Sequence, residues 1–80
     1  MNKSILIVGL GSVGKFHLMS ILRSKKTLDI TLLDNSNKAL KDAYIIFKKN
    51  KNNHNLNLID NIDLINKKYD IALISVSSDV

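Results

Sequence analysis

Apolar and polar positions alternate along the chain in blocks that predict strands and helices in turn. Four nearly uninterrupted apolar runs predict strands, at residues 4–8, 30–33, 56–59 and 71–76. The segments between these runs predict three helices, at residues 12–24, from 35–37 to about 49, and at 60–68. The polar, asparagine-rich stretch at 50–55 has no periodicity and predicts a surface loop.

The two longer predicted helices each carry an apolar stripe at intervals of three and four residues, which is typical of a helix that packs on a sheet. The stripe of the first helix comprises Gly14, His17, Leu18, Ile21 and Leu22. The stripe of the second helix comprises Leu40, Ala43, Tyr44 and Phe47. We expect both stripes to be buried.

The alternation of strands and helices with short connections predicts an α/β fold in which all strands run parallel. We expect four strands in the order 3-2-1-4 with flanking helices, which is part of the doubly wound Rossmann sheet. The first strand is almost entirely apolar, so we expect helices on both of its faces. A complete sheet of this kind has about six strands. Residues 1–80 are therefore interpreted as the amino-terminal part of such a domain, without its carboxyl-terminal substrate domain.

The first predicted strand runs into GLGSVG, a GxGxxG motif that opens the first predicted helix. Gly9 allows a sharp turn, Gly11 lets a pyrophosphate approach the main chain, and Gly14 lets the helix pack closely on the strand. The backbone N–H groups of Ser12, Val13 and Gly14 are expected to face the phosphates at the positive end of the helix dipole. The motif in this context predicts a dinucleotide-binding site.

An acidic residue stands where the second predicted strand ends. Asp34 lies 20 positions after Gly14, and its carboxylate is expected to accept hydrogen bonds from the adenosine ribose and to repel a 2′-phosphate. We therefore expect NAD to be preferred over NADP, since the nearest following cation is Lys38. The alternative role for Asp34 is that of a turn residue capping the second helix. Asn35 and Ser36 are expected to line the ribose edge or to cap that helix.

Polar residues also follow the fourth predicted strand, where it opens into the same crevice. Val76 and Ser77 are predicted to contact the cofactor, and the alternative for them and for their neighbours Ser75, Ser78 and Asp79 is ordinary loop polarity.

Neither histidine is predicted to carry chemistry. His17 lies on the sheet-facing side of the first helix and is expected to be packed and hydrogen-bonded, while His54 is expected to be solvated in the polar loop. Neither has cysteine or acidic partners at metal-ligand spacing, so we expect no metal site. No catalytic residue is predicted within these 80 residues.

Composition narrows the class of partner. The formal charge is +5, but the lysines are spread along the chain, and the tight lysine pairs fall at predicted helix ends, so nucleic acid is not an expected partner. The chain has no cysteine for a disulfide framework, no signal-peptide pattern and no apolar run approaching the ~20 residues of a membrane span. We expect a cytoplasmic protein without a membrane partner.

With these residues placed, the chain resembles the amino-terminal part of the Gfo/Idh/MocA family, the relatives of glucose-fructose oxidoreductase and inositol dehydrogenase. The resemblance rests on residues 9–18, which contain the pattern GxGxxGxxH, on Leu33-Asp34, and on the strand with its lead-in at residues 69–76. The resemblance implies hydride transfer between NAD or NADP and a sugar, inositol or nucleotide-sugar-like substrate. It also implies that a catalytic lysine in a Glu-Lys-Pro motif, the substrate domain and any homo-oligomer formed through that domain lie beyond Val80.

Two other interpretations remain at this point. The first is an NAD-sensing regulatory module of the kind that gates ion transport, which shares the glycine motif and the distant acid but performs no chemistry. Such modules usually carry a Gly-Asp-like turn after the third strand, and Asp60-Asn61 lacks that glycine. The second is a truncated gene product without activity.

Overall fold

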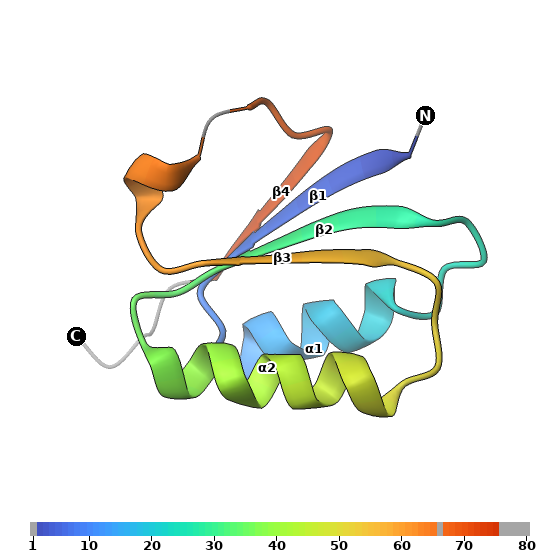
Figure 1. The fold of residues 1–80 in the computed structure, drawn as a ribbon, viewed down its shortest axis with the longest axis horizontal. Coiled ribbons are helices and arrows are strands. Elements are labelled where there is room, and N and C mark those ends of the chain that lie inside the picture. Colours follow the sequence, from blue (N-terminus) through green and yellow to red (C-terminus); the bar gives the residue numbers. More distant parts are fainter. Residues whose placement is uncertain (1, 66, 76–80) are drawn as a thin grey trace.

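The strands form one parallel sheet. The computed structural model describes residues 2–65 and 67–75. Its strands are β1 (Lys3–Val8), β2 (Leu28–Leu33), β3 (Asn55–Ile59) and β4 (Ile71–Ile74). They lie in the order β3-β2-β1-β4, and each neighbouring pair runs parallel (Figure 1). The predicted α/β fold and the strand order 3-2-1-4 are thereby confirmed.

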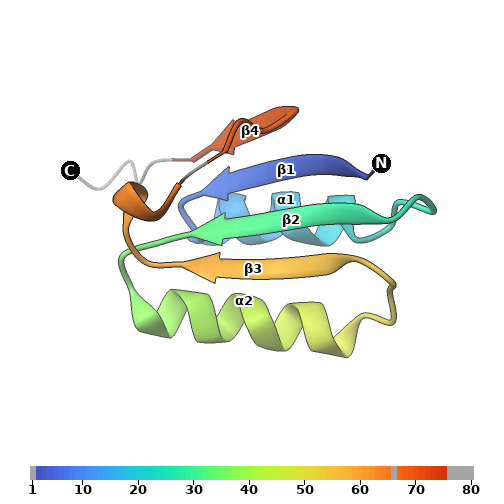
Figure 2. The same ribbon diagram turned by 45° about the horizontal axis from the view of Figure 1, so that its top comes forward.

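Both α-helices lie on the same face of this sheet. Helices α1 (Ser12–Ile21) and α2 (Asn37–Lys49) run side by side beneath it in Figure 1, and the turned view in Figure 2 agrees. The expectation of helices on both faces is wrong for the described part of the chain. An apolar strand predicts that both of its faces are covered, but the pattern does not say which element covers them. Here residues of the segment between β3 and β4 pack against the second face.

The main core lies between the helices and the sheet. Ile7, Leu18 and Leu32 are completely buried there, and burial of each such side chain stabilises the fold by ~1.5–3 kcal/mol. The apolar stripe of α1 is largely buried as predicted, whereas Tyr44 on α2 is 45% exposed. The Lys48 ammonium lies 5.9 Å from the centroid of the Tyr44 ring, so Tyr44 faces the solvent edge of the helix.

The second face of the sheet carries a smaller apolar cluster formed by Leu6, Leu33 and Ile59. Ile65 and Tyr69, from the connection between β3 and β4, pack against it. The predicted helix at 60–68 is only a single 3-10 turn, η1 (Ile62–Leu64). So short a segment cannot offset the cost of helix nucleation unless it buries an apolar stripe.

His54 fastens the amino-terminal ends of β2 and β3 to the end of α1. Its Nδ1 accepts a hydrogen bond from the Leu28 N–H at 3.0 Å, and its Nε2 lies 3.2 Å from the Leu22 carbonyl oxygen. This pair of partners assigns the proton to Nε2, which donates to Leu22. The expectation that His54 is solvated is therefore wrong, because its half-buried ring joins three elements.

Two carboxylates, Asp29 and Asp70, form hydrogen bonds between neighbouring chain segments at the same end of the sheet. Hydrogen bonds from the Asn55 and Asn2 side chains hold the pKa of Asp29 below its usual value. The Ser4 N–H donates to Asp70 Oδ2 at 2.8 Å, and this bond, with the Ser4 hydroxyl, lowers the pKa of Asp70. Both interactions lie at the end of the sheet opposite to the glycine motif.

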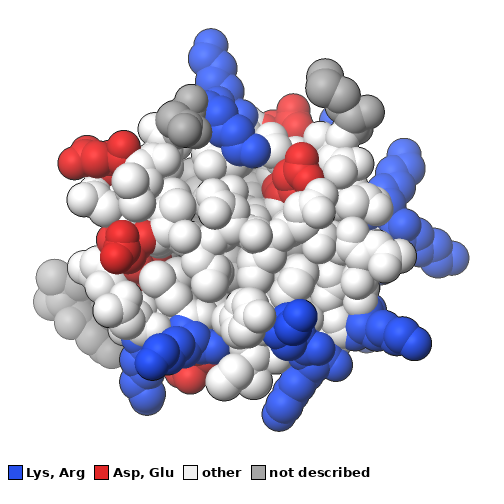
Figure 3. Space-filling view, in the orientation of Figure 1, with Lys and Arg blue, Asp and Glu red and all other residues white. Residues whose placement is uncertain are grey.

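The basic side chains project separately around the margin of the face shown in Figure 3, with acidic side chains between them at several points. None of the helices within residues 2–65 and 67–75 is long and apolar enough to cross a lipid bilayer.

Candidate functional site

The glycine motif forms the turn between β1 and α1, and Gly9 begins it. Gly9 has a φ of +89°, a backbone conformation that side-chain-bearing residues rarely adopt. A Cβ at this position would also collide with the carbonyl oxygen of Ser75 at the end of β4. The Gly9 N–H continues the sheet by donating to the Leu33 carbonyl oxygen at 2.9 Å. Glycine is thus required here by the protein itself.

Gly14 and Gly11 differ in which atoms lie near the position of a Cβ. A Cβ on Gly14 would collide with the carbonyl oxygen of Gly9, so α1 rests directly on the turn. Around the Cβ position of Gly11, by contrast, no heavy atom of the described residues lies within 4 Å apart from its sequence neighbours. Its φ of −72° is also ordinary for any residue. The described chain therefore imposes no need for glycine at position 11 and leaves open space beside it.

The amino terminus of α1 faces this open space without a side-chain cap. Gly11 is the N-cap residue, and within the described residues no side chain bonds to the terminus and no acidic residue lies in the first turn. Helix α2 provides the contrast, because Ser36 caps it by accepting a hydrogen bond from the Ala39 N–H at 3.2 Å. The N–H groups of Ser12 and Val13 are thus left to an external acceptor, as at helix termini that bind phosphate.

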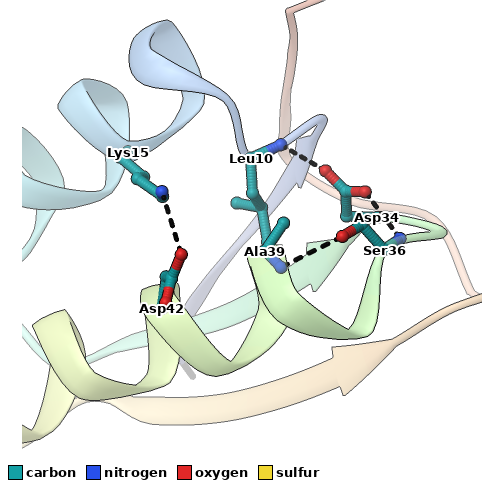
Figure 4. A network of polar contacts seen from close by, with 6 residues as sticks. All are labelled: Leu10, Lys15, Asp34, Ser36, Ala39 and Asp42. Atoms are coloured by element: carbon teal, nitrogen blue, oxygen red, sulfur yellow. Dashed lines mark hydrogen bonds and ion pairs between the residues drawn. The ribbon is translucent and has the colours of Figure 1, made fainter.

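Asp34 follows β2 and lies beside the glycine turn. Its Oδ2 accepts a hydrogen bond from the Leu10 N–H at 2.7 Å, and its Oδ1 accepts one from the Ser36 N–H at 2.8 Å (Figure 4). The second bond is the turn role that the sequence left open, and the first is a link that sequence alone did not suggest. Each oxygen keeps a lone pair for a further donor, so a ribose hydroxyl can still be accepted.

The neighbours of Asp34 have separate roles. Asn35 is exposed beside the turn, and Ser36 rather than Asn35 is the N-cap of α2. Lys15 of α1 pairs with Asp42 of α2 at 3.5 Å, so its ammonium faces the second helix (Figure 4). This arrangement leaves the N–H groups of α1, rather than a lysine, to meet an anion.

Ser75 also contributes contacts to the glycine turn, a structural role that the sequence did not reveal. Its hydroxyl donates to the Gly9 carbonyl oxygen at 3.0 Å, and its N–H donates to the Val8 carbonyl oxygen at 2.9 Å. The signal that points to it is topological: once β4 is placed beside β1, a small hydroxyl residue at its end must lie against the glycine turn. Val76 and Ser77 lie outside the described residues.

His17 lies away from these groups. It is half-buried on α1, with its ring centroid 6.5 Å from that of Phe16.

Most of the predicted site residues lie together at the carboxyl ends of β1 and β2. They are Gly9, Gly11, Ser12, Val13, Gly14, Asp34 and Asn35. Among the described residues, no cluster of three or more histidine, cysteine or acidic side chains could hold a metal ion.

Three features define an NAD(P)-binding Rossmann-like domain. They are the parallel sheet in this strand order, the GxGxxG turn before an uncapped helix, and the acidic residue at the end of β2. Residues 5–78 match the family model described as "ApbA: Ketopantoate reductase PanE/ApbA", and the chain belongs to that family. It is thereby placed among dinucleotide-binding oxidoreductases. Comparisons with curated proteins and with solved structures gave no match.

The family match changes two expectations. The resemblance to the Gfo/Idh/MocA family is not supported, and what remains of it is the NAD(P)-binding Rossmann-like domain. The expected preference for NAD is not supported by the match either, because the ketopantoate reductase family generally binds NADPH.

Proposed function

We propose that this chain binds the pyrophosphate of NAD(P) in the open space beside Gly11, as the cofactor-binding part of an oxidoreductase. The observation that carries the proposal is the contrast among the three glycines. Gly9 and Gly14 are required by contacts within the chain, whereas a side chain at Gly11 meets nothing described. The uncapped N–H groups of Ser12 and Val13 supply the donors that a phosphate needs.

The bound cofactor would supply the hydride, and the family name indicates where it goes. Ketopantoate reductase is named for reduction of a keto substrate. We therefore propose a ketone of this kind as the substrate class, in place of the sugar-like substrate expected from the earlier resemblance. The hydride would add to the carbonyl carbon and a proton to the oxygen, which yields a hydroxyl group. The family match also favours this enzymatic role over a regulatory NAD sensor.

The choice between NAD and NADP is a separate proposal, for NAD, and it rests on Asp34. Two backbone N–H groups hold this carboxylate at the end of β2, where the adenosine ribose of a Rossmann cofactor lies. A 2′-phosphate there would meet a fixed negative charge, at a cost of about 1–3 kcal/mol for charges several ångströms apart in a partly solvated site. Lys38, the nearest cation that follows Asp34 in the sequence, lies exposed in the first turn of α2.

The pyrophosphate site is tested by titrating NADH into the 80-residue chain and into the Gly11→Val variant, with cofactor fluorescence as the readout. We expect the wild-type chain to bind and the variant to lose binding while its melting temperature stays close to that of the wild type. Retained affinity in Gly11→Val would refute the site. Equal loss of affinity and of stability would show that position 11 serves the fold instead.

The cofactor preference is tested by comparing NADH with NADPH in the wild type and in Asp34→Asn. Both cofactors share the pyrophosphate, so the ratio of their dissociation constants cancels any change in the glycine turn. We expect NADH to bind about 5- to 150-fold more tightly in the wild type and the ratio to shrink in the variant. Equal or tighter binding of NADPH by the wild type would refute the preference and leave the pyrophosphate site standing.

A further inference from the structure

The peptide unit that joins Gly9 to Leu10 is held at both of its polar atoms by side chains from two different strands. On one side, the Leu10 N–H donates to Asp34, which follows β2, at 2.7 Å. On the other side, the Gly9 carbonyl oxygen accepts the hydroxyl of Ser75, which follows β4, at 3.0 Å. Figure 4 shows the first of these two contacts.

The topology explains why the two contacts can coexist. β1 lies between β2 and β4, and the N–H and C=O of a trans peptide point in opposite directions. A peptide lying across the end of β1 therefore offers its donor to one neighbour and its acceptor to the other. Both neighbours end at the same edge, because all three strands run parallel.

The turn needs such a restraint because its own residues do not fix it. Gly9 can adopt dihedral angles on both sides of the conformational map, so rotation of the Gly9–Leu10 peptide is not blocked by a side chain on Gly9. Rotating that peptide would break both hydrogen bonds at once. The Asp34 bond is made to a carboxylate, which makes it the stronger kind.

The orientation of this peptide also sets the position of α1. The Gly9 carbonyl oxygen lies so close to Gly14 that a Cβ there would collide with it. If that oxygen turned, the first turn of α1 and its free N–H groups would no longer rest on the same surface. The peptide thus links the side chains of Asp34 and Ser75 to the donors proposed for the pyrophosphate.

We propose that Ser75 and Asp34 clamp the Gly9–Leu10 peptide and so act as positioning residues for the pyrophosphate site. The proposal rests on the proposed function for its ligand, but the clamp itself exists in the ligand-free chain. Ser75 is the sharper test of the two, because Asp34 is also proposed to contact the ribose.

The first measurement is amide hydrogen exchange at Leu10, followed by NMR in the ligand-free 80-residue chain. We expect Ser75→Ala to accelerate exchange at Leu10 about 3- to 10-fold, as for loss of one hydrogen bond. The matched control is Ser20→Ala, which removes a hydroxyl whose only partner among the described residues is the Phe16 carbonyl oxygen within α1. Unchanged exchange at Leu10 in Ser75→Ala would overturn the clamp whether or not a cofactor binds.

The second measurement compares ADP-ribose with adenosine in the same variants. We expect Ser75→Ala to weaken ADP-ribose about 3- to 10-fold and to leave adenosine unchanged, because adenosine lacks the pyrophosphate. Ser75→Cys replaces the hydroxyl by a somewhat larger thiol that is a weaker donor, and should fall between wild type and alanine. Equal loss for both ligands, or none, would overturn the positioning role. Failure of the wild type to bind any dinucleotide would instead refute the proposed function.

Discussion

The three glycines of the motif should respond differently to the same one-carbon substitution. At Gly9, alanine must accept a φ near +89° and a collision with the Ser75 backbone. These two effects together should cost about 2–5 kcal/mol. At Gly14 the backbone is ordinary, and the collision with the Gly9 carbonyl oxygen alone should cost about 1–3 kcal/mol. At Gly11 nothing described is met, but Gly11 is the N-cap of α1, where alanine is less favourable than glycine, so alanine should cost no more than about 1 kcal/mol.

Urea denaturation followed by circular dichroism measures all three variants on one scale. A domain of this length is stable by roughly 4–12 kcal/mol, so Gly9→Ala should show a much lower midpoint or fail to fold, Gly14→Ala an intermediate one, and Gly11→Ala a midpoint only slightly below that of the wild type. NADH affinity should follow a different order, with Gly11→Val losing binding although it remains folded. A Gly11→Ala variant as unstable as Gly9→Ala would refute the view that space at position 11 is kept for a ligand.

Three further outcomes are expected from contacts away from the glycine turn. His54→Ala should destabilise the fold by about 1–3 kcal/mol, because the Leu28 N–H loses its acceptor; Asn53→Ala in the same loop is its control, and equal urea midpoints would contradict the role of His54. Ser36→Ala should cost about 1 kcal/mol through loss of the α2 cap, and an unchanged melting temperature would show that the cap contributes nothing. The pKa of Asp29 in the folded chain lies below the ordinary 3.8. Its contribution to the free energy of unfolding is therefore full above pH 3.8 and is lost as the pH falls toward the folded-state pKa. Urea midpoints between pH 6 and pH 2.5 should fall in acid, and less steeply in Asp29→Asn; parallel curves would contradict this contribution.

The sequence predicted the parts of the fold that depend on local pattern. Apolar runs and helical spacing located the four strands and the two α-helices of the described residues, and the alternation predicted the parallel order of the strands. The segment at 60–68 was predicted as a helix but folds as one 3-10 turn. Ile62 and Leu64, which the prediction placed in that helix, are exposed in the structure, so they do not supply the buried apolar stripe that a longer helix would need.

The interactions that escaped prediction join residues far apart in the chain. His54 bonds to Leu28 and Leu22, and Ser75 bonds to Gly9 across the sheet. No periodicity marks such pairs, because they exist only once the strands are ordered in space. The same holds for Asp34, whose distance from the motif predicted a ribose contact but not its bond to Leu10. The family also could not be settled from the glycine motif, which many dehydrogenases share.

The most direct test of the central claim is an NMR titration of the ¹⁵N-labelled 80-residue chain with NADH. The account predicts that the amide signals of Gly11, Ser12, Val13 and Gly14 shift and saturate together, because their backbone lies at the open space where the pyrophosphate is proposed to bind. The amide signals of residues at the amino ends of the strands, such as Leu28, should not shift. Saturable shifts elsewhere with none in the glycine turn, or no saturable shift at all, would contradict it.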